Sequence, residues 1–434
     1  MKTYLIFVFF TLLLIPQLAA QKVDLSQAMA MGLARNYDVQ IAIYNREIDA
    51  NNADRGNAGY LPTIFLQGQG SYSIQDTELE FASDQPGISA EGASTINYGA
   101  SANLEYMLFN GGRRMHIYRR FQLLSEESRL QERLAMENTG LQVAGNFLEV
   151  VRLADQKEIN NQTLELSQER LERAKQDYEY GNTTKLQLLN AEVDLRADSI
   201  AFTNSALELK KGMRKLNVAI GLPADTVLAI DSTFSFQALL SKDELLDQAL
   251  TSNTQYLQTR NTVIAADESV KAAKGDLWPT LSANAAYEYN YSDFEANFLS
   301  TQENLGWQAG IALRFNIFDG NRIQRSIANA KLQRQIAEVN EERNRNEVVQ
   351  RVNDAYDTYI TNLELLQISE RNLRLAELNF ERSEEAAAVG QITGIELREA
   401  QLNLKNAMNE ISRQRVLTKV AEMGLLYEAG ILLK

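Results

Sequence analysis

Leu108-Phe109-Asn110-Gly111-Gly112-Arg113 is the segment that decides the fold, because the chain carries a second version of it. That version, Ile317-Phe318-Asp319-Gly320-Asn321-Arg322, lies 209 positions further along. The same spacing relates other residues of matching character: Phe147 and Tyr356, Gly181 and Gly390, Thr184 and Thr393, Ala191 and Ala400, and Gly221 and Gly430. A gap-free internal repeat of this length predicts two copies of one structural unit.

The first 20 residues have the composition of a secretory signal peptide. Lys2 precedes an apolar run from Tyr4 to Ile15, and the segment then ends on the small residues Ala19 and Ala20. A charged start, a short apolar core and a small-residue end are typical of such a peptide. We predict a signal peptide at 1–20, cleaved after Ala20. The apolar run is too short to span a bilayer, and no later stretch has about 18 consecutive apolar residues.

Composition excludes several classes of protein. The chain has no cysteine, which excludes disulfides, thiol catalysis and cysteine zinc sites. A lipid anchor on an N-terminal cysteine is excluded as well, so we do not expect a lipoprotein. The net charge of −14 argues against a nucleic-acid partner, which needs a basic surface. Five prolines in 434 residues are compatible with long helices.

We expect a first repeat at 21–221, a linker at 222–242 and a second repeat at 243–434. Helices are predicted where apolar residues recur at steps of three and four. They span 25–60, 114–180 and 184–220 in the first repeat, and 243–277, 322–389 and 393–430 in the second. Pro62 and Pro279 end the first helix of each repeat, because a proline disfavours helix in the residue before it.

Alternating polar and apolar residues predict four strands, at 63–75, 96–108, 280–291 and 305–317. Each is at least as long as a tilted transmembrane strand, and one face of each is apolar with aromatic residues. A half-buried sheet in a soluble protein is the alternative, but export, strand length and the aromatics favour a membrane sheet. The polar links 75–95 and 292–304 are expected to be surface loops.

Four strands cannot close a barrel in a membrane, because open edges in lipid leave backbone groups unpaired. The sheet must therefore be completed by other copies of the chain. Barrels of about eight strands are filled by side chains. Three copies would supply twelve strands and leave room for a channel.

Taken together, the order helix, strand, strand, long helix, helix in two copies resembles the TolC-like outer-membrane efflux channel family over essentially the whole mature chain. The Leu-Pro and Trp-Pro starts of the strands, the Phe-Asn-Gly-Gly and Phe-Asp-Gly-Asn ends and the Gly-x-x-Thr turns carry the resemblance. It implies a mostly helical fold with a membrane β part. It also implies a homotrimer, in which a twelve-stranded β-barrel meets outer-membrane lipid and continues as a coiled-coil α-helical barrel through the periplasm of a Gram-negative bacterium.

The resemblance further implies a function. The chain would be the outer-membrane component of a tripartite efflux or type I secretion system, a passive duct docked to a periplasmic adaptor (membrane fusion) protein and an inner-membrane pump. The linker would form an equatorial segment. The turns bearing Gly181, Thr184, Gly390 and Thr393 would be the tips that meet the adaptor.

Two acidic residues at a step of three ring the periplasmic aperture in this family, and Glu396 and Glu399 match them. The step of three places both on one helical face. In a trimer their mutual repulsion would raise their pKa values and favour cations. The alternative is an ordinary solvated face near Arg398. The tyrosine and arginine of the family's gate are replaced by Ala387 and Ile392, which leaves the aperture latch undefined.

An enzyme is the rival class. His116 is the only histidine and has no partner evident in the sequence, so we expect a surface or packing role for it. We find no metal-ligand cluster, nucleophile motif or phosphate loop, and predict no catalytic residue, cofactor or metal. Two non-enzymatic alternatives are a stand-alone trimeric porin and a periplasmic coiled-coil structural protein.

Overall fold

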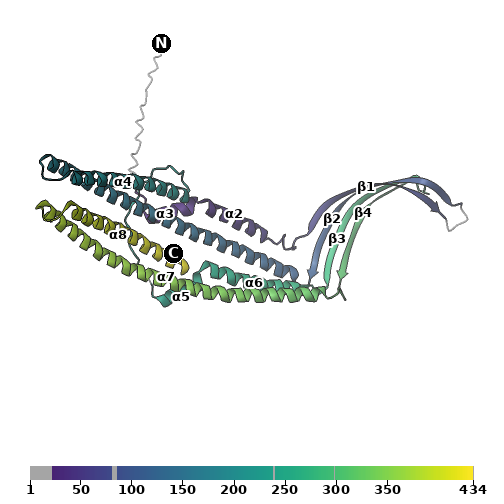
Figure 1. Cartoon of the computed structure of the whole chain (residues 1–434). Coiled ribbons are helices and arrows are strands. Elements are labelled where there is room, and N and C mark those ends of the chain that lie inside the picture. The colour runs from purple at the N-terminus through teal and green to yellow at the C-terminus, as the bar shows by residue number, and fades with distance from the viewer. Residues whose placement is uncertain (1–21, 81–85, 238–239, 298, 434) are drawn as a thin grey trace, which may run out of the picture. The chain divides into compact units, whose positions relative to one another are not determined.

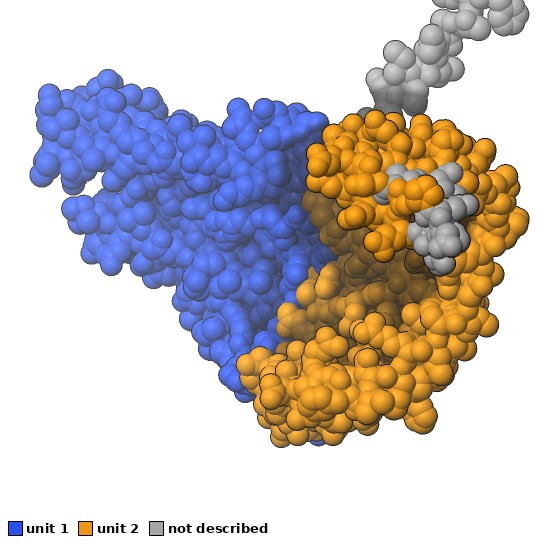
Figure 2. Space-filling view, turned by 90° about the vertical axis from the view of Figure 1, so that its right-hand side faces the viewer, with its two compact units in different colours: residues 1–40, 135–253, 349–434 blue, residues 41–134, 254–348 orange. Residues whose placement is uncertain are grey.

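The computed structural model describes residues 22–80, 86–237, 240–297 and 299–433. The predicted signal peptide therefore lies outside the described residues. The chain divides into two compact units, shown in Figure 2. Unit 1 comprises residues 1–40, 135–253 and 349–434, and unit 2 comprises residues 41–134 and 254–348.

The described residues form helices and four antiparallel strands in two repeats (Figure 1). In chain order the elements are α1 (Leu25–Arg35), α2 (Tyr37–Asn52), β1 (Thr63–Leu79), β2 (Ile88–Asn110), α3 (Arg113–Glu179), α4 (Lys185–Ala219), α5 (Lys242–Ser252), α6 (Thr254–Gly275), β3 (Thr280–Phe294), β4 (Thr301–Arg314), α7 (Arg322–Ala388) and α8 (Gly394–Glu428).

The internal repeat is visible in the helix bounds. Helices α3 and α7 have 67 residues each, and α4 and α8 have 35 each. Both pairs begin and end 209 positions apart. At 1.5 Å per residue, α3 and α7 are each about 100 Å long. Among the described residues, no helix has the length and hydropathy needed to cross a lipid bilayer.

The prediction of a single helix at the start of each repeat was wrong. The segment 25–60 is divided into α1 and α2 at Asn36, and 243–277 is divided into α5 and α6 at Asn253. Both asparagines are extended, with ψ angles of 137° and 122°. Asn36 Nδ2 donates to the carbonyl oxygen of Ala219 (3.0 Å), and Asn253 Nδ2 donates to that of Glu428 (2.9 Å). The asparagine at each break thus supplies a hydrogen bond to the carbonyl oxygen of the last residue of α4 or α8, which has no partner within its own helix.

Strand bounds also differ from the prediction. β1 and β2 reach Leu79 and Ile88, and β3 and β4 extend to Phe294 and Thr301, so much of both polar links is strand rather than loop. Ladder hydrogen bonds join backbone groups, so pairing continues where the side-chain alternation fades. β4 ends at Arg314, three positions before the predicted end, 317.

The strands form one sheet in the order β1-β2-β3-β4, side by side in Figure 1. The register aligns Leu66 with Ala102, Ala102 with Tyr287, and Tyr287 with Trp307. Directly paired residues share a face, so this row of apolar side chains crosses all four strands. The rings of Tyr287 and Trp307 lie 4.7 Å apart. The apolar sides of the four predicted strands therefore form one continuous face.

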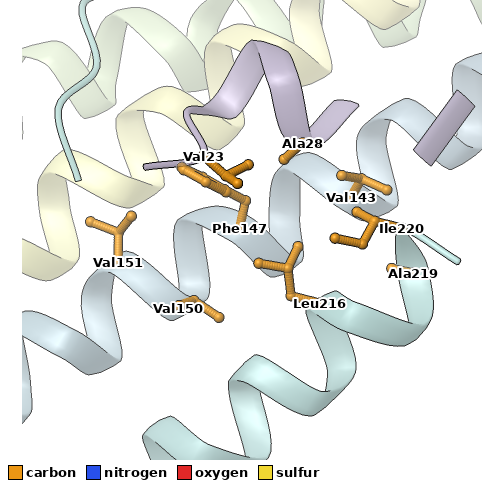
Figure 3. Close-up of a cluster of buried hydrophobic side chains, with 9 residues drawn as sticks. All are labelled: Val23, Ala28, Val143, Phe147, Val150, Val151, Leu216, Ala219 and Ile220. Atoms are coloured by element: carbon orange, nitrogen blue, oxygen red, sulfur yellow. The ribbon is translucent and has the colours of Figure 1, made fainter. Parts of the chain in front are cut away.

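The core of unit 1 joins three helices (Figure 3). Its buried members are Val23 and Ala28 at the start of the chain, Val143, Phe147, Val150 and Val151 of α3, and Leu216, Ala219 and Ile220 at the end of α4. Gly32 of α1 allows close packing, since a Cβ there would lie 2.7 Å from Val143 Cγ2. Val23 N–H donates to Ala229 O (2.8 Å), which holds part of the linker against this core.

In unit 2, the turn after β2 packs against the end of α6. Gly111 has a φ of 64°, and a Cβ there would lie 2.1 Å from the carbonyl oxygen of Gly275. No larger residue fits this position, which explains why the deciding segment carries glycine there.

Candidate functional site

The first tip joins α3 to α4. Gly181 has a φ of 75°, in the left-handed region that favours glycine, and its N–H donates to Tyr178 O (3.1 Å). Thr184 is the N-cap of α4, and its side chain accepts from the N–H of Gln187 at 3.3 Å. The predicted glycine and threonine thus end one helix and start the next.

The second tip joins α7 to α8 in the same way. Gly390 has a φ of 74°, and Thr393 is the N-cap of α8. Thr393 and Glu396 form a capping box: the carboxylate accepts from the N–H of Thr393 at 2.7 Å and from its hydroxyl at 2.9 Å. The first tip has Gln187 where the second has Glu396, so the tips differ in charge at this position.

Exposed apolar side chains flank both tips, and the sequence analysis missed them. Leu186 and Ile395 occupy equivalent positions in the two repeats and are 66% and 71% exposed. Tyr180 and Val389, a second equivalent pair, are also exposed. Their recurrence at the 209-residue spacing, directly beside each Gly-x-x-Thr turn, was the signal that could have revealed them.

Glu396 and Glu399 are both exposed on the first turns of α8. The pKa of Glu396 lies below its ordinary value of 4.5, because the backbone and hydroxyl of Thr393 hydrogen-bond to its carboxylate. Glu396 therefore has a structural role within one chain. The raised pKa values expected in a trimer require other copies, and they remain a prediction.

Arg398, which lies between the two exposed glutamates in the chain, is half-buried and binds other partners. Its Nη1 and Nη2 donate to the two carboxylate oxygens of Asp198, at 2.8 and 3.1 Å. Ser167 Oγ donates to the same carboxylate at 2.5 Å. Asp194 pairs with Arg170 at 3.2 Å and with Arg398 at 3.6 Å. We call these five residues the tip ion cluster. It joins α3, α4 and α8 within unit 1.

The tip ion cluster is stabilised by its own hydrogen bonds. Burial would raise the pKa of Asp198, but hydrogen bonds from Arg398 and Ser167 outweigh burial and lower it below its ordinary value of 3.8. Nearby Lys405, whose Nζ lies 3.8 Å from Asp198, has a pKa lowered by burial. Two carboxylates and three cations thus meet where α3, α4 and α8 approach one another, about four helical turns from the first tip.

The two positions that replace the family's gate residues take no part in this cluster. Ala387 is half-buried, and its carbonyl oxygen accepts from the N–H of Gly390 at 3.1 Å. Ile392 is half-buried within the turn. The tip ion cluster, a polar connection between α3, α4 and α8, was not predicted from the sequence.

The prediction that His116 is a surface or packing residue agrees with its half-buried position, but it has a partner. His116 Nδ1 lies 2.7 Å from Glu268 Oε2 of α6, and Lys271 Nζ lies 2.8 Å from the other oxygen. Burial raises the pKa of Glu268, but hydrogen bonds from Lys271 and His116 outweigh burial and lower it. Within the part of the chain that the structure describes, no group of three or more His, Cys, Asp or Glu residues is arranged to hold a metal ion.

Solved structures share this architecture. The Campylobacter jejuni CmeC outer membrane channel matches with a TM-score of 0.78 at 15% identity, over 94% of this chain and 86% of that one. CusC matches with a TM-score of 0.73 at 18% identity, over 94% and 92%. VceC, an outer membrane protein of Vibrio cholerae, matches with a TM-score of 0.74 at 14% identity, over 94% and 96%. At these identities the likeness establishes the fold.

Sequence comparison supplies the family. No curated protein matches the chain. The profile of the family described as "Outer membrane efflux protein" matches residues 28–222 and 245–427, which is most of both repeats. The chain therefore belongs to the outer membrane efflux protein family, a family of TolC-like channels rather than enzymes.

Proposed function

We propose that three copies of this chain form a passive duct through the outer membrane and periplasm, as the channel component of a tripartite efflux or type I secretion system. The observation that carries the proposal is the sheet. It has an apolar face across all four strands, and its edge strands β1 and β4 have no further partner strand among the described residues.

The free edges support the number of copies. In lipid, each unpaired backbone group costs several kcal/mol, so β4 of one copy must pair with β1 of the next. Two copies would give eight strands, an interior that side chains fill. Three copies give twelve strands and an open interior.

The tips support docking. Leu186 and Ile395 are exposed apolar residues beside the two glycine turns, at equivalent positions of the two repeats. Apolar side chains at such positions favour burial against a partner protein. We assign the tips, with Gly181, Thr184, Gly390 and Thr393, to the periplasmic adaptor. In this proposal the adaptor connects the duct to an inner-membrane pump, which supplies the energy for transport.

Export through a signal peptide is part of the proposal. Its features lie in residues 1–20, and the absence of cysteine leaves no residue for an N-terminal lipid anchor. The mature protein would be held in the outer membrane by its sheet alone.

Substitutions at the tips test the docking. Leu186→Asp with Ile395→Asp should abolish export of a dye from the native host, because charge opposes burial at the adaptor. Gly181→Val with Gly390→Val should also reduce export, since a β-branched residue is strained at a positive φ. Val227→Asp is the control, because Val227 is exposed and lies in the linker.

The amount and oligomeric state of each variant in the outer membrane must equal those of the wild type. Full export by both tip variants would contradict the docking assignment and favour a stand-alone porin. Loss of export in Val227→Asp as well would show that the tips have no special role.

A further inference from the structure

Unit 2 contains a groove with a basic lining where the sheet gives way to the helices. It encloses about 590 Å³ between α3, α6 and α7. Its charged residues are Arg113 and Arg120 of α3, Arg322 and Arg325 of α7, and Asp276 after α6. We call it the basic groove. Four guanidinium groups and one carboxylate give it a net charge of +3, in a chain whose own net charge is −14.

Small side chains of α6 create the space. Ser269, Ala272 and Ala273 line the groove on the side of that helix. They lie at steps of three and one, so they share a face with Asp276 and leave a gap that the arginines border. The volume is sufficient for a phosphate group and its neighbouring atoms.

The carboxylates near the basic groove do not provide hydrogen-bond acceptors for all four guanidinium groups. Asp276 Oδ1 accepts from Arg113 Nη1 at 2.6 Å. Asp319 caps α7, accepting from the N–H groups of Arg322 (3.1 Å) and Ile323 (2.9 Å), and its carboxylate lies 3.9 Å from Arg322 Nε. Arg120 Nε is buried without a hydrogen-bond partner among the described residues. Solvent does not reach this atom, but the positive charge of the guanidinium group is only partly compensated by the chain, so an anion in the groove would be stabilising.

Exposed apolar residues lie along the chain beside these arginines. Ile317 and Phe318, which precede the first turn of α7, are 91% and 82% exposed. Trp278, two residues after Asp276, is exposed as well. Aromatic residues next to arginines are typical of the level of lipid headgroups, where rings contact acyl chains and guanidinium groups reach phosphates.

We propose that the basic groove binds the phosphate of an anionic phospholipid headgroup in the leaflet that faces the periplasm. Arginine is suited to this ligand, because its planar fork donates two parallel hydrogen bonds to phosphate oxygens. The inference rests on the proposed function, since it needs the sheet to cross the outer membrane and the groove to lie at its periplasmic end.

Lipid binding by the full-length protein tests the proposal. Detergent-extracted protein is titrated with phosphatidylglycerol or phosphatidylcholine, and bound lipid is counted by native mass spectrometry. The wild type should retain phosphatidylglycerol in preference to phosphatidylcholine. Arg322→Gln with Arg325→Gln should weaken phosphatidylglycerol binding by roughly tenfold or more, because hydrogen bonds to charged groups are lost.

The control variant removes the same charge from the same helix. Arg343 and Arg345 are exposed residues of α7 outside the basic groove. Arg343→Gln with Arg345→Gln should bind phosphatidylglycerol as the wild type does. An equal loss of phosphatidylglycerol binding in both variants would show that the effect depends on net charge alone, and it would contradict binding in the basic groove.

Two further results separate the outcomes. If inorganic phosphate displaced phosphatidylglycerol at equal concentration, the ligand would be a soluble anion and the lipid assignment would be wrong. If a protein that is trimeric and conducts ions showed no preference among lipids, the groove would be refuted while the proposed duct stood. A protein that is not trimeric would refute the duct itself.

Discussion

Glu396 caps α8, and we also propose an electrostatic role for it at the aperture; pH and substitution separate the two roles. Its carboxylate caps α8, and its pKa is lowered by the hydrogen bonds from Thr393. A lowered folded-state pKa means that the cap is stabilising above the unfolded pKa and is lost as the pH falls through the folded value. The start of α4 has Gln187 in the same position and does not titrate.

We therefore expect the first turn of α8 to fray as the pH falls below the ordinary glutamate pKa of 4.5, while the first turn of α4 changes little. Hydrogen exchange of the two turns, corrected for the intrinsic effect of pH, measures the difference. Equal fraying of both turns would show that the Glu396 cap is not formed in solution.

The second, proposed role is electrostatic. If the two glutamates ring the aperture, Glu396→Gln with Glu399→Gln should reduce the cation preference of the channel and its block by multivalent cations, because their charge is removed. Glutamine can also occupy this position of a capping box, so the helix start is preserved. Conductance in planar bilayers measures the effect, with Glu381→Gln and Glu384→Gln of α7 as the matched control. Unchanged ion selectivity would contradict the acidic ring.

At the scale of single residues, the sequence predicted the features that depend on neighbouring residues in the chain. The glycines of the turns and the threonine caps follow from backbone conformation and capping, which involve neighbouring residues. The tip ion cluster was missed because it joins Ser167, Asp198 and Arg398, which are far apart in the chain. No periodicity indicates which of many charged residues will meet.

At the scale of elements, the tip ion cluster should determine how firmly α4 and α8 hold to α3. Asp198→Asn removes the carboxylate to which Arg398 donates two hydrogen bonds and leaves only Asp194, 3.6 Å away, which costs about 3 kcal/mol. Amide exchange in α4 and α8 near residue 198 should then be about a hundredfold faster. Asp198→Asn with Arg398→Met should cost less, because the buried guanidinium group is removed together with the carboxylate that binds it. Equal losses in both variants would contradict this account.

The same cluster predicts a pH dependence. The pKa of Asp198 is lowered, so its stabilising effect is complete above the unfolded pKa and is lost as the pH falls through the folded value. Protection of these helices should therefore weaken in acid in the wild type and change less in Asp198→Asn.

The breaks between α1 and α2 and between α5 and α6 predict a second effect. Asn36→Ala and Asn253→Ala each remove a buried side-chain amide that caps the end of α4 or α8. Each should lower local stability by about 1–3 kcal/mol. Hydrogen exchange at residues 219–222 and 428–431 measures the loss, with Asn57→Ala as an exposed control. Wild-type exchange at these ends would show that the amides are dispensable.

The bounds of α3 and α7 were predicted to within one residue, because these helices are repeated and contain no proline. The breaks were missed because an asparagine inside a helical pattern looks like an ordinary polar residue. The partner of Asn36 lies 183 positions away, and only the fold brings it near. Strand ends were missed because backbone pairing extends beyond the alternation of side chains.

At the scale of the whole molecule, the central claim is that the chain is incomplete alone. Among the described residues, its sheet has an apolar face and two edge strands without a further partner strand, and closure by further copies would account for both. Family membership was foreseen from the order of weak motifs in two copies. The number of copies rests on the geometry of barrels rather than on any single residue.

The most direct measurement is the native mass of the protein extracted by detergent from outer membranes, corrected for bound detergent. The account predicts three copies, hence twelve strands, and resistance of the protein to release by salt. A monomer, or a protein that salt alone releases from the membrane, would contradict the barrel and leave an exported coiled coil.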